Sequence, residues 1–349
     1  MDIKRNLAVF LIIFAFFSCK MDSRLNPYYV NGSHENRDYL TLLLDLLETE
    51  ATGSEGEFAV IREIAANYAR QGDFDRLVHF LTDVSINNPG NPYNAYYFLM
   101  IAYAYIQLDS LPIAAMYFDI IVNNYPDLTI SDESIHLVAL SHLIDINTNP
   151  KRQVWYYQEL ISRFPESIDL GTDFFMMGQA CESIGDWNGA IQAYANFMAF
   201  PGTVIHGFPN AYQYAKQQVD FSRSPKDWTY ETLPALRQSI EHALDTGNPR
   251  ALERSRAKVN FFARSWGQTD TDDARIVDFN LAQFMYGNRI RYAGTLDASS
   301  TATEAFLRTT GWSRYMPTWY LYFRKIYFPQ DPEIHGRWEW AGIYYGEKF

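Results

Sequence analysis

The sequence predicts a mainly α-helical protein, built from repeated helical hairpins and ending in a C-terminal helical, aromatic-rich module that allows a small β-hairpin. Three observations predict this fold class. Residues 172–201 have the pattern of two amphipathic helices joined by a tight turn, and three earlier segments are degenerate copies of that pattern. The last 39 residues, 311–349, instead concentrate aromatic side chains in short runs that favour β-strands.

The hairpin at residues 172–201 shows the repeat most clearly. The apolar face of its first helix has residues at i, i+3, i+4 and i+7, namely Phe174, Met177, Gly178 and Cys181. After a break at Gly185 and Asp186, its second helix has another apolar face, formed by Trp187, Ala190, Ile191, Tyr194 and Phe197. A glycine inside a helix costs about 1 kcal/mol relative to alanine. We therefore expect a neighbouring helix to approach closely at Gly178 and Ala190.

This order of small residues, aromatic residues, Gly-Asp turn and final proline resembles the tetratricopeptide repeat, especially the type found in bacterial lipoproteins. The resemblance implies a right-handed α-solenoid. Equivalent sites recur after 37, 39 and 37 residues, at Tyr68, Tyr105, Ile144 and Cys181. The turn sites keep the same register, at Gly72, Asp109, Thr148 and Gly185. The third copy departs from the pattern, with Pro150 just after the turn and Gln153 where a small residue is expected.

Residues 1–18 have the pattern of a lipoprotein signal peptide. Lys4 and Arg5 precede an apolar run over 7–17, which as a helix would span only about 16 Å, roughly half of a bilayer core. Ser18 then precedes Cys19, an arrangement that resembles the site where bacterial lipoproteins are lipidated. We expect lipidation at Cys19; the alternative is an ordinary secretory signal with an incidental cysteine. Residues 19–37 are expected to form a flexible tether.

The remaining chain divides into two predicted parts. Residues 38–201 comprise a capping helix over 39–47 and the four repeats, since repeat arrays need caps. Glycine and proline then interrupt the pattern, and residues 202–349 form the C-terminal module. Within it we expect helices at 211–221 and 233–244 and a turn at 247–249. The helix after that turn would carry a basic stripe, either solvated or in contact with anionic lipid, formed by Arg250, Arg254 and Lys258.

The end of the chain leaves alternatives open. Residues 271–287 have the pattern of a capped helix, whereas a strand could begin near Ile290. The aromatic runs at 319–328 and 337–345 predict a β-hairpin or small sheet packed on the last helices. This aromatic module either closes the helical array or offers rings on which a sugar or other ligand could stack.

The resemblance implies that the first helix of each repeat lines the inner wall of the array, where such proteins bind partners. The candidate partner-binding residues on this wall are Arg62, Tyr96, Leu99, Tyr103, His142, Phe175, Gln179 and Glu182. The alternative is that the aromatic members of this set only pack against neighbouring helices.

The composition and motifs restrict the function. A net charge of −12 argues against a nucleic-acid partner. The two cysteines suggest no disulfide framework, and Cys181 is expected to pack in the core. No phosphate-binding loop, His-Glu-x-x-His, Gly-x-Ser-x-Gly or metal-spaced cysteine pair occurs. We therefore predict no catalytic residue, cofactor or metal ion, and a protein that is not an enzyme.

Two functional hypotheses follow. The first is a lipid-anchored scaffold or adaptor on the periplasmic side of a bacterial cell envelope, attached to either membrane, which holds a protein partner in the groove of its array. It resembles both outer-membrane assembly lipoproteins and the repeat lipoproteins that treponemes pair with periplasmic transporters. The second is a ligand-binding accessory lipoprotein of a periplasmic transport system, with a small hydrophobic or sugar ligand. An enclosed cavity would favour the second hypothesis, and an open groove the first.

Overall fold

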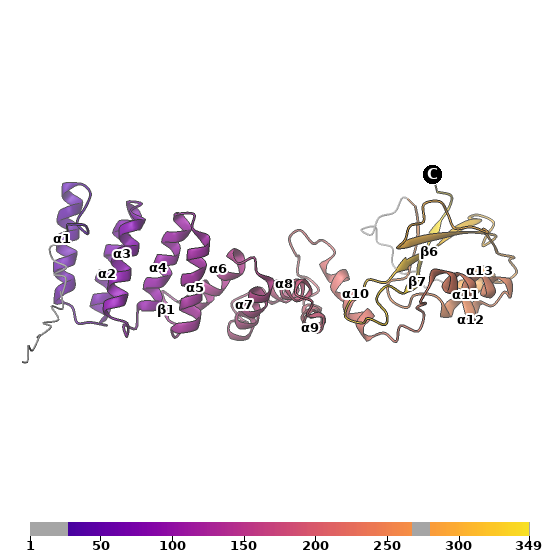
Figure 1. The fold of residues 1–349 in the computed structure, drawn as a ribbon, viewed down its shortest axis with the longest axis horizontal. Coiled ribbons are helices and arrows are strands. Elements are labelled where there is room, and N and C mark those ends of the chain that lie inside the picture. The colour runs from indigo at the N-terminus through magenta and orange to yellow at the C-terminus, as the bar shows by residue number, and fades with distance from the viewer. Residues whose placement is uncertain (1–26, 267–279, 349) are drawn as a thin grey trace, which may run out of the picture. The chain divides into compact units, whose positions relative to one another are not determined.

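The computed structural model describes residues 27–266 and 280–348. Within these residues the protein is mainly helical, with thirteen α-helices and two small β-sheets (Figure 1). The chain divides into two compact units, Met1–Ile146 (unit 1) and Asn147–Phe349 (unit 2). The predicted signal peptide and Cys19 lie outside the described residues. Among the helices that the structure describes, none is both long and apolar enough to cross a membrane.

Unit 1 consists of helices that pack in chain order, each against the next (Figure 1). They are α1 (His34–Thr49), α2 (Glu55–Arg70), α3 (Phe74–Asn87), α4 (Asn94–Gln107), α5 (Leu111–Asn124) and α6 (Ile135–Ile146). A two-stranded antiparallel ribbon, β1 (Thr129–Ile130) and β2 (Glu133–Ser134), precedes α6. The expected capping helix lies within α1, whose buried leucines pack against α2 and α3.

The described end of the predicted tether is not a loose linker. Tyr29 is buried, and its ring lies edge-on to Phe80 of α3. The Tyr68 hydroxyl donates a 2.7 Å hydrogen bond to the Tyr29 carbonyl oxygen. The helix α1 then begins at His34, capped by the Ser33 side chain. The prediction of a flexible segment is therefore wrong for residues 28–37, because two neighbouring tyrosines provide enough apolar surface to hold the chain against the helices.

In the sequence of unit 2, the helices α7–α12 come before the first strand of its sheet, and α13 comes between the first two strands. They are α7 (Pro150–Arg163), α8 (Leu170–Ser183), α9 (Trp187–Phe197), α10 (Ala211–Arg223), α11 (Leu233–Asp245), α12 (Pro249–Arg254) and α13 (Leu281–Met285). The first four pack successively against one another. The second helix of the third repeat copy does form, because Pro150 occupies the first turn of α7, where its missing N–H is not needed, and Asn149 caps the helix. The predicted module boundary at 201/202 lies inside unit 2 and stays a prediction.

The turns of three predicted hairpins share one backbone conformation. Gly72, Asp109 and Gly185 have φ angles of +70°, +54° and +75°, the left-handed conformation that ends many helices. The close contact predicted in the fourth hairpin is also present. A Cβ atom on Gly178 would overlap the ring of Tyr194 on α9, and Ala190 is buried. The small residues therefore mark the contact between α8 and α9, as the sequence predicts.

The C-terminal part of unit 2 contains a five-stranded sheet with the order β3-β7-β6-β5-β4. Its strands are β3 (Phe262–Ser265), β4 (Arg291–Tyr292), β5 (Glu304–Thr310), β6 (Thr318–Lys325) and β7 (Trp338–Tyr345). All neighbours are antiparallel except β3 and β7. The predicted hairpin is β6–β7, and the structure extends it to a sheet. Alternate residues of β6 face two apolar clusters, with Trp319, Leu321 and Phe323 toward the core that includes α11, and Tyr320 and Tyr322 on the other face.

One expectation for residues 247–292 is wrong, and the alternatives left open for the end of this segment are both represented. The predicted basic stripe does not exist, because α12 ends at Arg254 and Lys258 lies beyond it, 2.6 Å from Asp227. The chain leaves the helix because the Ala257 N–H donates to the Trp340 carbonyl oxygen, which starts the parallel pairing of this segment with β7. For the open alternatives at 271–296, residues 271–279 lie outside the described ranges. The rest contains both a short helix, α13, and a short strand, β4.

Candidate functional site

Four of the predicted partner-binding residues of unit 1 form two pairs, each around a phenylalanine. The Arg62 guanidinium lies 5.6 Å from the Phe58 ring centroid, and the Tyr96 ring lies 5.2 Å from the same ring. A 3.2 Å hydrogen bond joins the Tyr103 hydroxyl to His142 Nε2, and the His142 ring stacks on Phe118. Burial lowers the pKa of His142, with a partial offset from Asp145, so the imidazole is neutral at pH 7.

The exposed fraction of each side chain shows which of the predicted residues of unit 1 could contact a partner. Arg62 is exposed, and Tyr103 is 39% exposed. Tyr96 and His142 are half-buried. Leu99 is only 7% exposed and packs in the core, so its side chain offers little surface to a partner.

The three predicted residues of unit 2 lie on α8 and meet the tyrosines of the next two helices. Phe175 is fully buried, with its ring against Tyr194, Phe197, Phe208 and Tyr214. It therefore belongs to the core rather than to a binding surface. The Gln179 amide donates a 2.8 Å hydrogen bond to the Tyr194 hydroxyl. The Tyr214 hydroxyl is 2.8 and 2.9 Å from the two carboxylate oxygens of Glu182.

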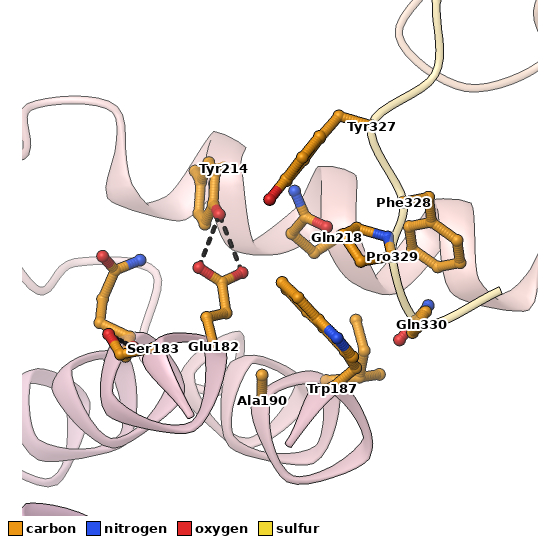
Figure 2. Close-up of a pocket in the computed structure, with 12 residues that line it drawn as sticks. Glu182, Ser183, Trp187, Ala190, Tyr214, Gln218, Tyr327, Phe328, Pro329 and Gln330 are labelled. Atoms are coloured by element: carbon orange, nitrogen blue, oxygen red, sulfur yellow. Dashed lines mark hydrogen bonds between the residues drawn. The ribbon is translucent and has the colours of Figure 1, made fainter. Parts of the chain in front are cut away.

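Gln179 and Glu182 also line a pocket of about 240 Å³ in unit 2, which we call the α8–α10 pocket (Figure 2). It is open to solvent on one side and is lined by side chains of α8, α9 and α10 and by residues 327–330, which follow β6. Its lining consists of Gln179, Glu182, Ser183, Trp187, Ala190, Ile191, Tyr214, Gln218, Tyr327, Phe328, Pro329 and Gln330. Drug-sized ligands occupy pockets of about 300–1,000 Å³. The α8–α10 pocket therefore suits a small ligand or a single side chain.

Local structure fixes the positions of Trp187 and Phe328, two aromatic residues that line this pocket. The turn at Gly185 ends α8, and the Asp186 carboxylate accepts a 3.0 Å hydrogen bond from the Gly189 N–H, so that α9 begins at Trp187. On the other side, Phe328 is buried against Phe221 of α10 at 4.6 Å between ring centroids. The Phe328 N–H donates to His335 Nδ1 at 3.1 Å. The loop is thus fastened at Phe328, while the adjacent Tyr327 remains 75% exposed.

The chemistry of the lining is aromatic and acidic. It contains four aromatic residues, three glutamines and one carboxylate, but no lysine, arginine or histidine. Burial raises the pKa of Glu182, and the hydrogen bonds from Tyr214 and Tyr194 act in the opposite direction. Figure 2 shows Trp187 and Tyr327 on opposite sides of the pocket, with Glu182 and Gln218 between them.

Metal and thiol chemistry find little support in the described ranges. There, no group of three or more His, Cys, Asp or Glu side chains could hold a metal ion. Cys181 is a buried free thiol beside this pocket. Burial, together with Asp186 and Glu182, raises its pKa to about 11, so it stays protonated at neutral pH.

The sequence interpretation identified only the α8 part of the pocket. It assigned Trp187 to an apolar packing face, and Tyr214 and Gln218 to a short helix without a function. Residues 327–330 were read as part of a strand and its connection. The aromatic-proline run Tyr327-Phe328-Pro329 was the available signal, but its position against α10 depends on contacts between residues more than 100 positions apart. Comparisons of the whole chain with protein-family models and with curated protein sequences found no match.

Proposed function

We propose that this protein is a lipid-anchored adaptor of the bacterial cell envelope that faces the periplasm and binds a protein partner through a helical-repeat array. In this proposal the helices form a right-handed solenoid of the tetratricopeptide type. Support comes from helix pairs at the predicted places, from left-handed turns at Gly72, Asp109 and Gly185, and from the close contact at Gly178. The acidic composition is consistent with a partner other than nucleic acid.

One observation carries the binding role most directly. Two of the residues predicted to contact a partner, Gln179 and Glu182, line the α8–α10 pocket. A pocket of this size accepts one side chain of a protein partner, and Tyr327 and Trp187 offer aromatic surface of the kind enriched at interface hot spots. The surface around Tyr103 and His142 in unit 1 is a second proposed contact region, since it combines an exposed ring with a polar hydrogen bond.

Site-specific photocrosslinking tests this proposal. We would replace Tyr327 by p-benzoylphenylalanine in the full-length protein, expressed in its native bacterium, and irradiate intact cells. The matched control places the same residue at Tyr286, which is 90% exposed and does not line the pocket. A discrete protein adduct at position 327 that is absent at 286 is expected. Equal labelling at both positions, or no protein adduct at 327, would contradict an adaptor that uses this pocket.

A second candidate function is a ligand-binding accessory lipoprotein of a periplasmic transport system. It is favoured by residues 327–330, which close one side of the pocket as the α8–α10 helices close the other (Figure 2). Such a protein would bind a small molecule in the absence of any protein partner. Native mass spectrometry of the protein purified from envelopes distinguishes this candidate, because only it requires a bound small molecule.

A further inference from the structure

We infer that the α8–α10 pocket binds an organic ammonium group, held by the Glu182 carboxylate and the rings of Trp187 and Tyr327. This inference rests on the proposed binding role of the pocket and specifies the chemistry of its occupant. The ammonium group could belong to a free small amine or to a lysine side chain of the protein partner. Both sources present the same charge and N–H donors to the pocket, and the experiment below separates them.

The charge of the lining gives the first argument. Glu182 is the single carboxylate of the pocket, and the lining holds no cationic side chain. Among the residues that the structure describes, Glu182 forms no ion pair and is hydrogen-bonded only by tyrosine. Two lysines on or just after α10 are already engaged: Lys226 places its ammonium over the Phe328 ring at 5.5 Å and donates to the Ser222 and Ser224 carbonyl oxygens, and Lys216 pairs with Asp220. A half-buried carboxylate of this kind favours a cation over an anion.

The rings give the second argument. Trp187, Tyr214, Tyr327 and Phe328 all contribute to the lining. The faces of tryptophan and tyrosine attract cations, and cages of such rings bind ammonium ligands. Figure 2 shows Trp187 and Tyr327 on either side of the space next to the Glu182 carboxylate. A cation placed there would meet negative charge on one side and aromatic rings on two others.

The glutamines give the third argument. Gln179 uses its amide N–H₂ to donate to Tyr194, which leaves the amide oxygen as its acceptor. Gln218 and Gln330 bring further amide oxygens to the lining. A primary ammonium carries three N–H donors and no acceptor. Carboxylate and amide oxygens therefore match its hydrogen-bonding needs. The lining also holds N–H and O–H donors, so it is the charge of Glu182 that disfavours an anion here.

Titration calorimetry with simple probes tests this inference on the full-length protein in detergent. n-Butylammonium is the ligand, and n-butanol and butyrate are matched neutral and anionic controls. We expect n-butylammonium alone to bind. Glu182→Gln should weaken its binding about tenfold, since the isosteric amide can still accept from Tyr214 but has no charge. Glu253→Gln should leave binding unchanged, since Glu253 is another half-buried carboxyl whose pKa burial raises, but it is outside the pocket.

The pH dependence supplies a test that needs no variant. The titratable groups around Glu182 are the phenols of Tyr214, Tyr194 and Tyr327 and the thiol of Cys181. Burial raises the pKa of the Tyr214 and Tyr194 phenols and of the Cys181 thiol. Only Glu182 among these groups then changes charge in acid. Binding of n-butylammonium should therefore weaken as the pH falls through the raised pKa of Glu182. Binding that is unchanged by acid, or equal for n-butanol and n-butylammonium, would overturn the inference.

The same probe separates the two sources of the ammonium group and the two levels of the proposal. If n-butylammonium binds and its presence reduces the amount of protein adduct formed at position 327, a lysine of the protein partner is the source. If it binds although no protein adduct forms, the source is a free amine, and the adaptor proposal fails while the inference stands. If an adduct forms but n-butylammonium does not bind, the inference is wrong and the adaptor proposal stands.

Discussion

Glu182 illustrates how a polar residue of a helix surface can be held inside a pocket. Its place among the predicted partner-binding residues of α8 suggests a carboxylate exposed to solvent. In the structure it is half-buried and accepts hydrogen bonds from Tyr214 on the next helix but one. That expectation is wrong, because the helical periodicity of α8 does not show that α10 will place a phenol above this position.

We predict that Glu182→Lys destabilises the protein. The substitution removes the acceptor for the Tyr214 hydroxyl and puts an ammonium group into a half-buried site, and buried polar groups that lose a partner cost about 1–3 kcal/mol. Urea denaturation followed by circular dichroism measures the loss. Glu166→Lys is the control, since Glu166 is exposed at the end of the previous helix pair and should change stability by less than about 0.5 kcal/mol. Similar midpoints for both variants would contradict this view of Glu182.

Asp173, in the first turn of α8, is a second carboxyl whose protonation is coupled to folding. Burial, and secondarily Asp169, raises its pKa from 3.8 to about 6. Because the pKa of Asp173 is higher in the folded than in the unfolded state, its protonated carboxyl contributes to the stability of the fold. This contribution is complete below about pH 3.8 and is lost as the pH rises past about 6. Asp173→Asn should therefore increase the free energy of unfolding at pH 7 and make no difference near pH 3.5. An equal effect at both pH values would contradict the assigned pKa.

At the scale of elements, the helices were predictable where local signals agreed. The pairs α8–α9 and α4–α5 follow from apolar periodicity and from turn residues at Gly185 and Asp109. The end of α12 at Arg254 was not predictable, since residues 250–262 keep a helical pattern whereas the backbone from Arg256 onward pairs with β7. The strand β3 depends on the same pairing over about 80 positions. Local propensity cannot report such contacts, because their partners lie in distant sequence.

The contact between α8 and α9 gives a prediction about element packing. Ala190 is buried where Gly178 allows the Tyr194 ring to lie against α8. Ala190→Leu should destabilise the protein by about 1–3 kcal/mol, because Ala190 is only 1% exposed and a larger side chain would overpack its contact with α8. Asn188→Leu is a control on an exposed position of the same helix turn. If the thermal midpoint of the Ala190→Leu variant equals that of the control, the two helices do not approach as described.

At the scale of the whole molecule, the sequence predicted a mainly helical chain and a β-hairpin or small sheet near its end, but not the strands that complete the sheet. The hairpin β6–β7 was recognisable from its aromatic runs, whereas β5 has the ordinary composition Glu-Ala-Phe-Leu-Arg-Thr-Thr and gains its place by pairing with β6. The candidate site was likewise predictable only in part. Gln179 and Glu182 followed from the repeat register, and Tyr214 and Tyr327 required the folded arrangement of unit 2.

The proposed attachment of the protein to a membrane rests on Cys19, a residue outside the described ranges. The motive for the prediction is the apolar run over 7–17 followed by Ser18 and Cys19. Two acyl or prenyl signals are needed for stable anchoring, because a single chain gives only marginal membrane binding. A lipoprotein-type cysteine that carries more than one acyl chain would meet this need, and a lipid on Cys19 is the anchor that we propose.

Cys19→Ala should therefore move the protein from the detergent phase to the aqueous phase in a Triton X-114 partition of cells that express the full chain. Cys181→Ala is the matched control, because it makes the same chemical change at the only other cysteine, which is buried between α8 and α9 and has no part in anchoring. We expect the control to remain in the detergent phase together with the parent protein. If Cys19→Ala partitions like the parent, the anchor is not a lipid on this cysteine, and the uncleaved apolar run would have to hold the protein at the membrane instead.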